Sequence, residues 1–193
     1  MPNVVEKTAR GEVTVDVYTR LLKDRIIWLG EKIDTKVANE IMAELLFLEH
    51  DDPEEDVFMY INSPGGSVDA AMGIYDTMQF IQPNIVTICA GGSYSMATLL
   101  LCAGTEGKRY ALPNATIHQY ISRGDVSDYT PNVQVNDAQL KRLVGRVYRA
   151  IALHTKQPLE KVEADFQTDN YLTAEEALEY GFIDEIITKS LSM

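Results

Sequence analysis

The chain has few of the residues on which metal, redox and secreted proteins depend. Only two of its 193 residues are cysteines, Cys89 and Cys102, and both lie in apolar segments without CxxC spacing. Cysteines of this kind are typical of buried free thiols in a reducing compartment. No run reaches the roughly 18 apolar residues of a membrane span, and the N-terminal stretch MPNVVEKTARGEV lacks the apolar core of a signal peptide. We therefore expect a soluble, cytoplasmic protein without a membrane partner.

Positive charge is also scarce. The sequence has 17 lysines and arginines against 29 aspartates and glutamates, which gives a net charge of −12. Such a chain repels polyphosphate backbones, so nucleic acid is a poor candidate partner. Hydrophobic residues make up 46% of the chain, which is enough for the core of one domain. No internal repeat or linker divides the sequence.

Segments with strand and helix patterns alternate along the chain. Strands are predicted at 25–29, 56–62 and 85–88, and helices at 34–49, 68–81 and 95–102. This order predicts right-handed βαβ crossovers and a mainly parallel sheet with helices outside, which is an α/β fold. Further strands are expected at 108–112, 115–121 and 183–187, and further helices at 136–154, 159–166 and 174–181.

Three segments depart from a plain globular pattern. Residues 1–16 show no convincing period, so we expect a mobile arm, with Asp16 capping a short helix after it. The helix at 136–154 is long for a small domain and is expected to project. In the helix at 34–49, Leu46 and Phe47 fall away from the apolar stripe that should face the core. Two large apolar side chains facing outward indicate a contact with another chain.

The segment 84–104 contains the strongest candidate for chemistry. Its sequence, NIVTICAGGSYSMATLLLCAG, predicts a buried strand that breaks at Gly91-Gly92 and is followed by an apolar helix from Ser95. A serine at such a turn lies where backbone N–H groups are available to an oxyanion, although GGSYS is not the G-x-S-x-G pattern. The pattern leaves open whether Ser93 or Ser95 is the nucleophile, and whether either does more than cap the helix. The glycine turn SPGG at 63–66 is expected at the same sheet edge.

A serine nucleophile needs a base, and the sequence offers three histidines. His50 follows a helix among acids, and His154 ends a helix, where a charged imidazole is favoured by the helix dipole, so both are interpreted as structural or solvated. His118 lies within a mostly apolar strand, where a polar ring needs a partner. Asp165 or Asp169 is suited to orient it, and spacing alone does not decide between them.

Longer motifs resolve these choices by resemblance. The ordered stretches YINSPGGSVDAAMGIYDTMQFI, TICAGGSYSMATLL, GKRYALPN, IHQ and TDNYLTAEEALEYGFID closely resemble the proteolytic subunit of Clp protease over residues 7–188. The resemblance implies a spiral α/β domain of βαβ units related to the crotonases, with residues 1–16 as an axial arm, a single domain at 17–193, and a projecting handle at about 120–150. It implies no metal or organic cofactor.

The resemblance also implies the roles of individual residues. Ser95 is the expected nucleophile, His118 the general base and Asp169 the carboxylate that holds the imidazole. The oxyanion hole would use the N–H groups of Gly66 and Met96, and a Cβ at position 66 would crowd the acyl oxygen. Two further expectations concern partners. Seven-membered rings of this chain or a sister subunit would enclose unfolded protein substrates, and an AAA+ unfoldase would dock on a hydrophobic cleft that includes Leu46, Phe47, Tyr60 and Phe80.

The chain departs from the family around the site. Tyr94 and Ala97 flank Ser95 and Met96 where alanine and glycine are usual, and Tyr120 replaces a proline after His-Gln. The stretch before His118 is shorter than usual, and the following loop is longer and lacks a Gly-Gly pair. In the family that loop contributes the edge strand to which a substrate peptide adds by β-augmentation. Gln167 and Thr168 stand where many members carry an Asp-Arg pair that links the rings.

Three functions are compatible with these features. The leading hypothesis is a serine endopeptidase subunit of an ATP-dependent Clp protease. The second is a weakly active or structural ring subunit that needs a sister subunit, because altered flanks can silence a complete triad. The third is a crotonase-type acyl-CoA enzyme, against which the retention of Ser95, His118 and Asp169 argues.

Overall fold

A computed structural model describes residues 2–8, 11–120 and 137–191 of the chain. The expected substrate-binding loop, together with the first part of the predicted handle, falls at 121–136, outside the described residues. Within the described ranges, no helix is both long enough and apolar enough to cross a membrane.

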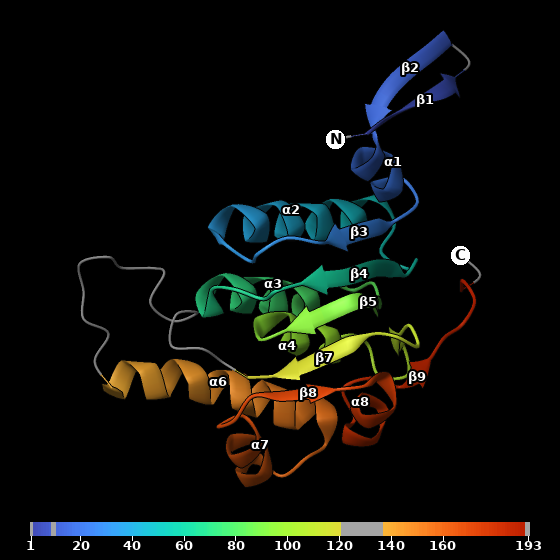
Figure 1. Cartoon of the computed structure of the whole chain (residues 1–193). Coiled ribbons are helices and arrows are strands. Elements are labelled where there is room, and N and C mark those ends of the chain that lie inside the picture. The colour runs from blue at the N-terminus through green and yellow to red at the C-terminus, as the bar shows by residue number, and fades with distance from the viewer. Residues whose placement is uncertain (1, 9–10, 121–136, 192–193) are drawn as a thin grey trace.

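Seven strands of the described chain form one sheet at the centre of the molecule (Figure 1). Five of the six parallel strands lie side by side in the order β3-β4-β5-β6-β9. Their bounds are β3 Ile26–Leu29, β4 Val57–Ser63, β5 Ile85–Tyr94, β6 Arg109–Ala111 and β9 Glu185–Ile186. The parallel order confirms the α/β fold predicted from the alternation of strands and helices.

β5 is long enough to have two partners along one edge. Residues 87–89 pair with β6, and residues 92–94 pair with β7 (Thr116–Gln119), both in parallel. β8 (Asn170–Leu172) then adds to β7 in the antiparallel direction. The sheet therefore changes partner near the end of β5, which places β7 beside the chain segment that leads into Ser95.

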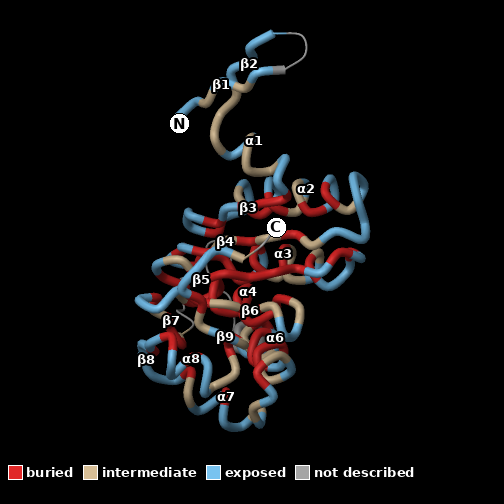
Figure 2. Tube along the Cα trace, turned by 90° about the vertical axis from the view of Figure 1, so that its right-hand side faces the viewer, coloured by how far each residue is buried: buried red, intermediate tan, exposed pale blue. Residues whose placement is uncertain are grey.

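Helices cover one face of the sheet and enclose the main core. They are α2 Thr35–Asp51, α3 Val68–Phe80, α4 Met96–Cys102, α6 Asp137–Thr155, α7 Leu159–Asp165 and α8 Ala174–Tyr180. The buried residues concentrate in the strands and on the inward sides of α2, α3 and α4 (Figure 2). On α2, Ile41, Leu45 and Leu48 are buried whereas Leu46 and Phe47 are exposed, as the stripe predicted. The N-terminal end of α6 reaches past the sheet in Figure 1.

Side-chain caps begin the helices where the sequence predicted them. Asp16 accepts hydrogen bonds from the N–H groups of Tyr18 and Thr19 at the start of α1 (Val17–Leu22). Thr173 and Glu176 form a reciprocal capping box at the start of α8. These bonds satisfy backbone donors that have no partner within the helix, so local sequence is enough to set these boundaries.

The N-terminal arm is regular, contrary to expectation. β1 (Asn3–Thr8) and β2 (Gly11–Asp16) pair as an antiparallel hairpin that extends away from the body (Figure 1). Glu6 ties the hairpin to α1 through ion pairs with Arg20, at 2.7 Å, and with Lys23. The sequence predicted no strands here, because a hairpin that buries neither face leaves no clean alternation of polar and apolar residues to detect.

The central strand was also predicted too short. β5 does not break at Gly91-Gly92 but continues through both glycines to Tyr94. The side chain of Asn62 on β4 accepts a hydrogen bond from the N–H of Gly92 at 3.0 Å, and the register of β4 with β5 shifts near this point. The glycines therefore accommodate an irregular pairing within the strand, and the turn itself falls at Ser95.

Candidate active site

Ser95 occupies the sharp turn between β5 and α4. Its backbone has φ 52° and ψ −118°, a combination that a non-glycine residue rarely adopts. Strain of this kind costs roughly 1 to 3 kcal/mol and gathers at functional sites. Ser93, the other candidate, is fully buried inside β5. The geometry thus favours Ser95 as the residue with a special role.

The glycine turn after β4 lies directly against this serine. A Cβ built on Gly65, whose φ is +79°, would lie 2.3 Å from the carbonyl oxygen of Tyr94, 2.9 Å from Cβ of Ser95 and 3.0 Å from N of Met96. The two turns predicted to share a sheet edge are therefore in contact. Gly65 was not among the predicted site residues, although the Gly-Gly doublet was a signal that two positions here need a special backbone.

Gly66 is held by a backbone bridge to Ile33. The N–H of Ile33 bonds to the carbonyl of Gly65 and the N–H of Ser67 bonds to the carbonyl of Ile33, each at 2.8 Å. In a parallel bridge of this pattern the N–H of Gly66 itself points away from Ile33. A Cβ on Gly66 would lie 2.1 Å from the Ile33 oxygen. Glycine is thus required here by Ile33, and the crowding of an acyl oxygen stays a prediction.

His118 reaches the same edge from β7. It pairs with Tyr94 across the two strands and is buried. Its Nε2 lies 2.9 Å from Oδ1 of Asp169, which immediately precedes β8. Asp165 instead accepts hydrogen bonds from Lys161 at 2.6 Å and from the Tyr180 hydroxyl at 2.8 Å. The structure therefore brings Asp169, and not Asp165, to the histidine.

The nitrogen that faces Asp169 is the unexpected one. In the serine-histidine-aspartate arrangement the carboxylate binds Nδ1–H and Nε2 receives the serine proton. Here the carboxylate is on Nε2. Nε2 of His118 therefore faces Asp169 in this structure, and catalytic hydrogen bonds often align only when substrate is bound.

The other histidines have surroundings that do not suit a general base. His50 is exposed near the end of α2. Nε2 of His154 lies 3.1 Å from the hydroxyl of Tyr75. Burial first, and then the positive charge of Arg109, lowers the pKa of His154, so the neutral ring is favoured there and not the charged ring expected from the helix dipole.

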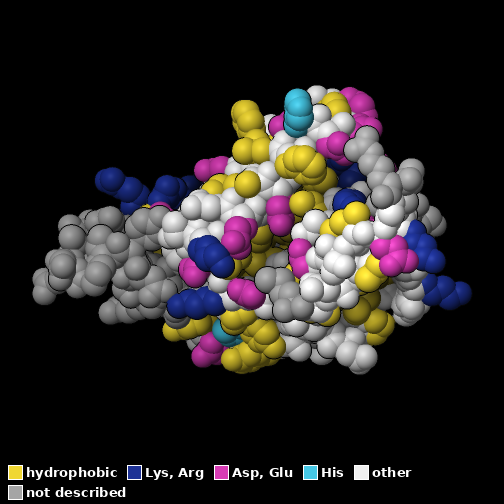
Figure 3. Space-filling view, turned by 90° about the horizontal axis from the view of Figure 1, so that it is seen from above, with side chains coloured by type: hydrophobic (Ala, Val, Ile, Leu, Met, Phe, Trp, Pro, Cys, Tyr) yellow, Lys and Arg dark blue, Asp and Glu magenta, His cyan; other side chains and the backbone are white. Residues whose placement is uncertain are grey.

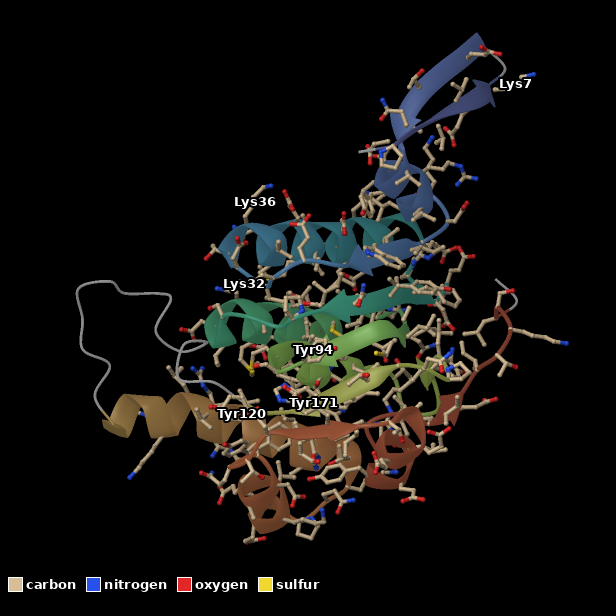
Figure 4. All side chains as sticks on the ribbon, viewed as in Figure 1. Lys7, Lys32, Lys36, Tyr94, Tyr120 and Tyr171 are labelled. Carbon is tan, nitrogen blue, oxygen red and sulfur yellow. The ribbon has the colours of Figure 1, made fainter. Side chains whose placement is uncertain are left out.

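Three tyrosines surround the imidazole of His118 (Figure 4). Tyr171 on β8 stacks on it, with ring centroids 4.3 Å apart and an angle of 19° between the planes. Tyr94 and Tyr120 lie at 5.9 Å and 5.8 Å with tilted rings. The sequence analysis noted Tyr94 and Tyr120 as departures from the family but overlooked Tyr171, because β8 itself was not predicted.

The sheet separates Tyr60 from the other residues expected to form a docking cleft. Leu46 and Phe47 on α2 and Phe80 at the end of α3 are exposed, and Figure 3 shows hydrophobic and acidic side chains interspersed at the end of the molecule that carries α2. Tyr60 stacks on Trp28, with centroids 5.8 Å apart. Tyr60 lies on the face of the sheet opposite the main core, because it alternates along β4 with residues whose side chains enter that core.

A strained serine at a strand-to-helix turn, beside a histidine paired with an aspartate at one sheet edge, defines the class of α/β serine hydrolases. Among the described side chains, no group of three or more His, Cys, Asp or Glu residues is arranged to hold a metal ion.

Comparisons with known proteins then identify the particular family. The family described as Clp protease matches residues 9–190. Two relatives from Dehalococcoides mccartyi, both named ATP-dependent Clp protease proteolytic subunit, are 48% (strain 195) and 47% (strain BAV1) identical to the chain over 189 residues. Each alignment covers 98% of this chain and 94% of the relative. The chain therefore belongs to the Clp protease family and is a serine peptidase.

Proposed function

We propose that this chain is the proteolytic subunit of an ATP-dependent Clp protease and hydrolyses unfolded polypeptides inside a ring-shaped chamber. The observation that carries the proposal is the contact between the two turns, where the Gly65 position lies against Ser95 and Met96. This contact occurs at the sheet edge where His118 meets Asp169. Nucleophile, base, carboxylate and candidate oxyanion donors thus come from separate segments to one place.

In the proposed reaction the Oγ of Ser95 attacks the carbonyl carbon of the scissile peptide bond while His118 takes its proton. The carbonyl oxygen becomes an oxyanion, and the N–H groups of Gly66 and Met96 are its proposed donors. Asp169 stabilises the imidazolium, which gives its proton to the leaving amine. Water then hydrolyses the acyl-enzyme on Ser95, with His118 again moving the proton.

The assembly follows from the same proposal. Seven-membered rings would confine substrate to the chamber, and an AAA+ unfoldase would supply unfolded chain from outside. Because Tyr60 lies on the opposite face of the sheet from Leu46 and Phe80, a docking cleft that uses all three needs two neighbouring subunits.

Burial raises the pKa values of Cys89 and Cys102 to about 12, which keeps both as unreactive thiols and suits a subunit that works in the cytoplasm.

A second candidate function is that of a weakly active ring subunit that needs a partner. The position of Asp169 on Nε2 of His118 favours it, because Nε2 is the nitrogen that receives the serine proton in the usual triad. Gln167 and Thr168 favour it as well, since neither can form the charged ring-to-ring pair of many relatives. The family match leaves no support for the crotonase alternative.

Labelling with a fluorophosphonate tests the proposed nucleophile. The reagent should modify Ser95 of the intact protein, and peptide mapping should find the adduct there. Ser95→Ala should remove both labelling and peptide hydrolysis by orders of magnitude, whereas Ser93→Ala should keep labelling at Ser95. An adduct on Ser93, or hydrolysis that persists in Ser95→Ala, contradicts the assignment.

A further inference from the structure

β8 places two side chains on the proposed catalytic histidine at once. The strand pairs with β7 in the register that sets Leu172 opposite Ile117, Tyr171 opposite His118 and Asn170 opposite Gln119. Directly opposite residues of an antiparallel pair have their side chains on the same face. Asp169 and Tyr171 are two positions apart, so an extended chain directs both to that face. One short segment therefore supplies a carboxylate at the edge of the imidazole and an aromatic ring on its face.

The stack between Tyr171 and His118 is close and specific. The centroids are 4.3 Å apart and the planes differ by 19°, whereas Tyr94 and Tyr120 are farther away and tilted. His118 is only 7% exposed, but Tyr171 is 60% exposed. Tyr171 therefore covers the imidazole and contributes little to the core (its label marks it beside Tyr120 in Figure 4).

The carboxylate of Asp169 by itself restrains the imidazole of His118 only weakly. The side chain of Asp169 is 61% exposed, so water screens its interaction with His118. A hydrogen bond at one ring atom also fixes only the direction from that atom to the carboxylate, and the plane of the imidazole can still rotate about this direction. Stacking restrains the plane of the ring in both protonation states, because the face of a tyrosine packs on a neutral ring and also attracts a cation. Orientations of the imidazole that share this plane keep the stack, so the stack is compatible with either ring nitrogen facing Asp169.

We propose that Tyr171 is a positioning residue, which holds the plane of the His118 imidazole by stacking while the proton moves between Ser95 and the leaving amine. This inference rests on the proposed function, because it assigns His118 as the base. Efficient proton transfer needs the base within a narrow range of positions, and small displacements at a reacting group lower turnover strongly.

Substitutions at Tyr171 separate stacking from simple bulk. Tyr171→Phe keeps the ring, and Tyr171→Leu keeps apolar volume without an aromatic face. With a short fluorogenic peptide, the Phe variant should stay within about twofold of the wild type, whereas the Leu variant should lose about tenfold in kcat with KM nearly unchanged. The rate of fluorophosphonate labelling at Ser95 should fall by a similar factor. Tyr18→Leu, at another exposed tyrosine, is the matched control and should change none of these values.

A spectroscopic readout reports the stack independently of turnover. The carbon-bound ring protons of His118 should show a ring-current shift in the NMR spectrum that Tyr171→Phe preserves and Tyr171→Leu removes. Normal kcat and labelling in the Leu variant, a loss confined to KM, or an unchanged His118 spectrum would each overturn the inference. Failure of the proposed function has a different signature, namely wild-type protein that is not labelled at Ser95 or labelling that His118→Ala does not slow.

Discussion

Replacing Gly65 with alanine should remove most of the peptidase activity at a modest cost in stability. The new Cβ would lie 2.3 Å from the Tyr94 oxygen, 2.9 Å from Cβ of Ser95 and 3.0 Å from N of Met96. Contacts this short cannot persist, and two of the three neighbours are backbone atoms that cannot rotate away. The turn that carries Ser95 and the Met96 N–H must therefore move.

The size of each effect follows from this geometry. Gly65 has φ +79°, a left-handed conformation that costs a residue with a Cβ about 1 to 2 kcal/mol. For a protein of this size that corresponds to a fall in Tm of roughly 2 to 8 °C. A displacement of about 1 Å at the reacting groups costs on the order of 100-fold in turnover. We therefore expect kcat to fall about 100-fold in protein that remains folded.

Gly107→Ala is the matched control. Gly107 has φ +83°, nearly that of Gly65, but no atom lies within 4 Å of the Cβ built on it among the described residues. The control should thus show the same backbone penalty in a thermal unfolding scan and wild-type kcat with a short fluorogenic peptide. The reasoning is refuted if Gly65→Ala keeps a kcat within threefold of Gly107→Ala.

Three further predictions concern stability, docking and assembly. Asp184→Asn should lower the free energy of unfolding at pH 7 by about 2 to 3 kcal/mol, because Asp184 accepts a hydrogen bond from Nε of the buried Arg109 at 2.8 Å. Burial raises the pKa of Asp184, but the hydrogen bonds and charge of Arg109 hold that pKa below its ordinary value. This stabilisation is therefore present above about pH 4 and is lost as the pH falls further. Urea unfolding at several pH values should show that the free energy of unfolding of the variant falls less steeply toward acid pH, and an unchanged pH dependence would contradict the assignment. Phe80→Ala should weaken unfoldase-dependent protein degradation and spare short peptides, and equal loss of both would exclude a docking role. With Gln167 and Thr168 in place of a charged pair, the chain alone should form single rings, or double rings with low peptidase activity; a fully active fourteen-subunit particle in sedimentation of the pure protein would disprove this.

The sequence by itself determined the elements whose signals are local. An apolar residue at every third or fourth position placed Ile41, Leu45 and Leu48 in the core and left Leu46 outside. Caps such as Thr173 set helix starts, because the bonds join residues three apart. The alternation of strands and helices was enough for a parallel sheet, and the family motifs carried the assignment of the catalytic residues.

Tertiary structure alone decided how the site is put together. β8 has three residues and no period, and it forms because β7 offers it an edge. The contact of Asp169 with His118, and the stack of Tyr171 on the same ring, both depend on the register of these two strands, whose members are 51 residues or more apart. Local patterns carry no information about such a register. The contact of Gly65 with Ser95 likewise joins two turns on neighbouring strands, so only the packed sheet brings them together.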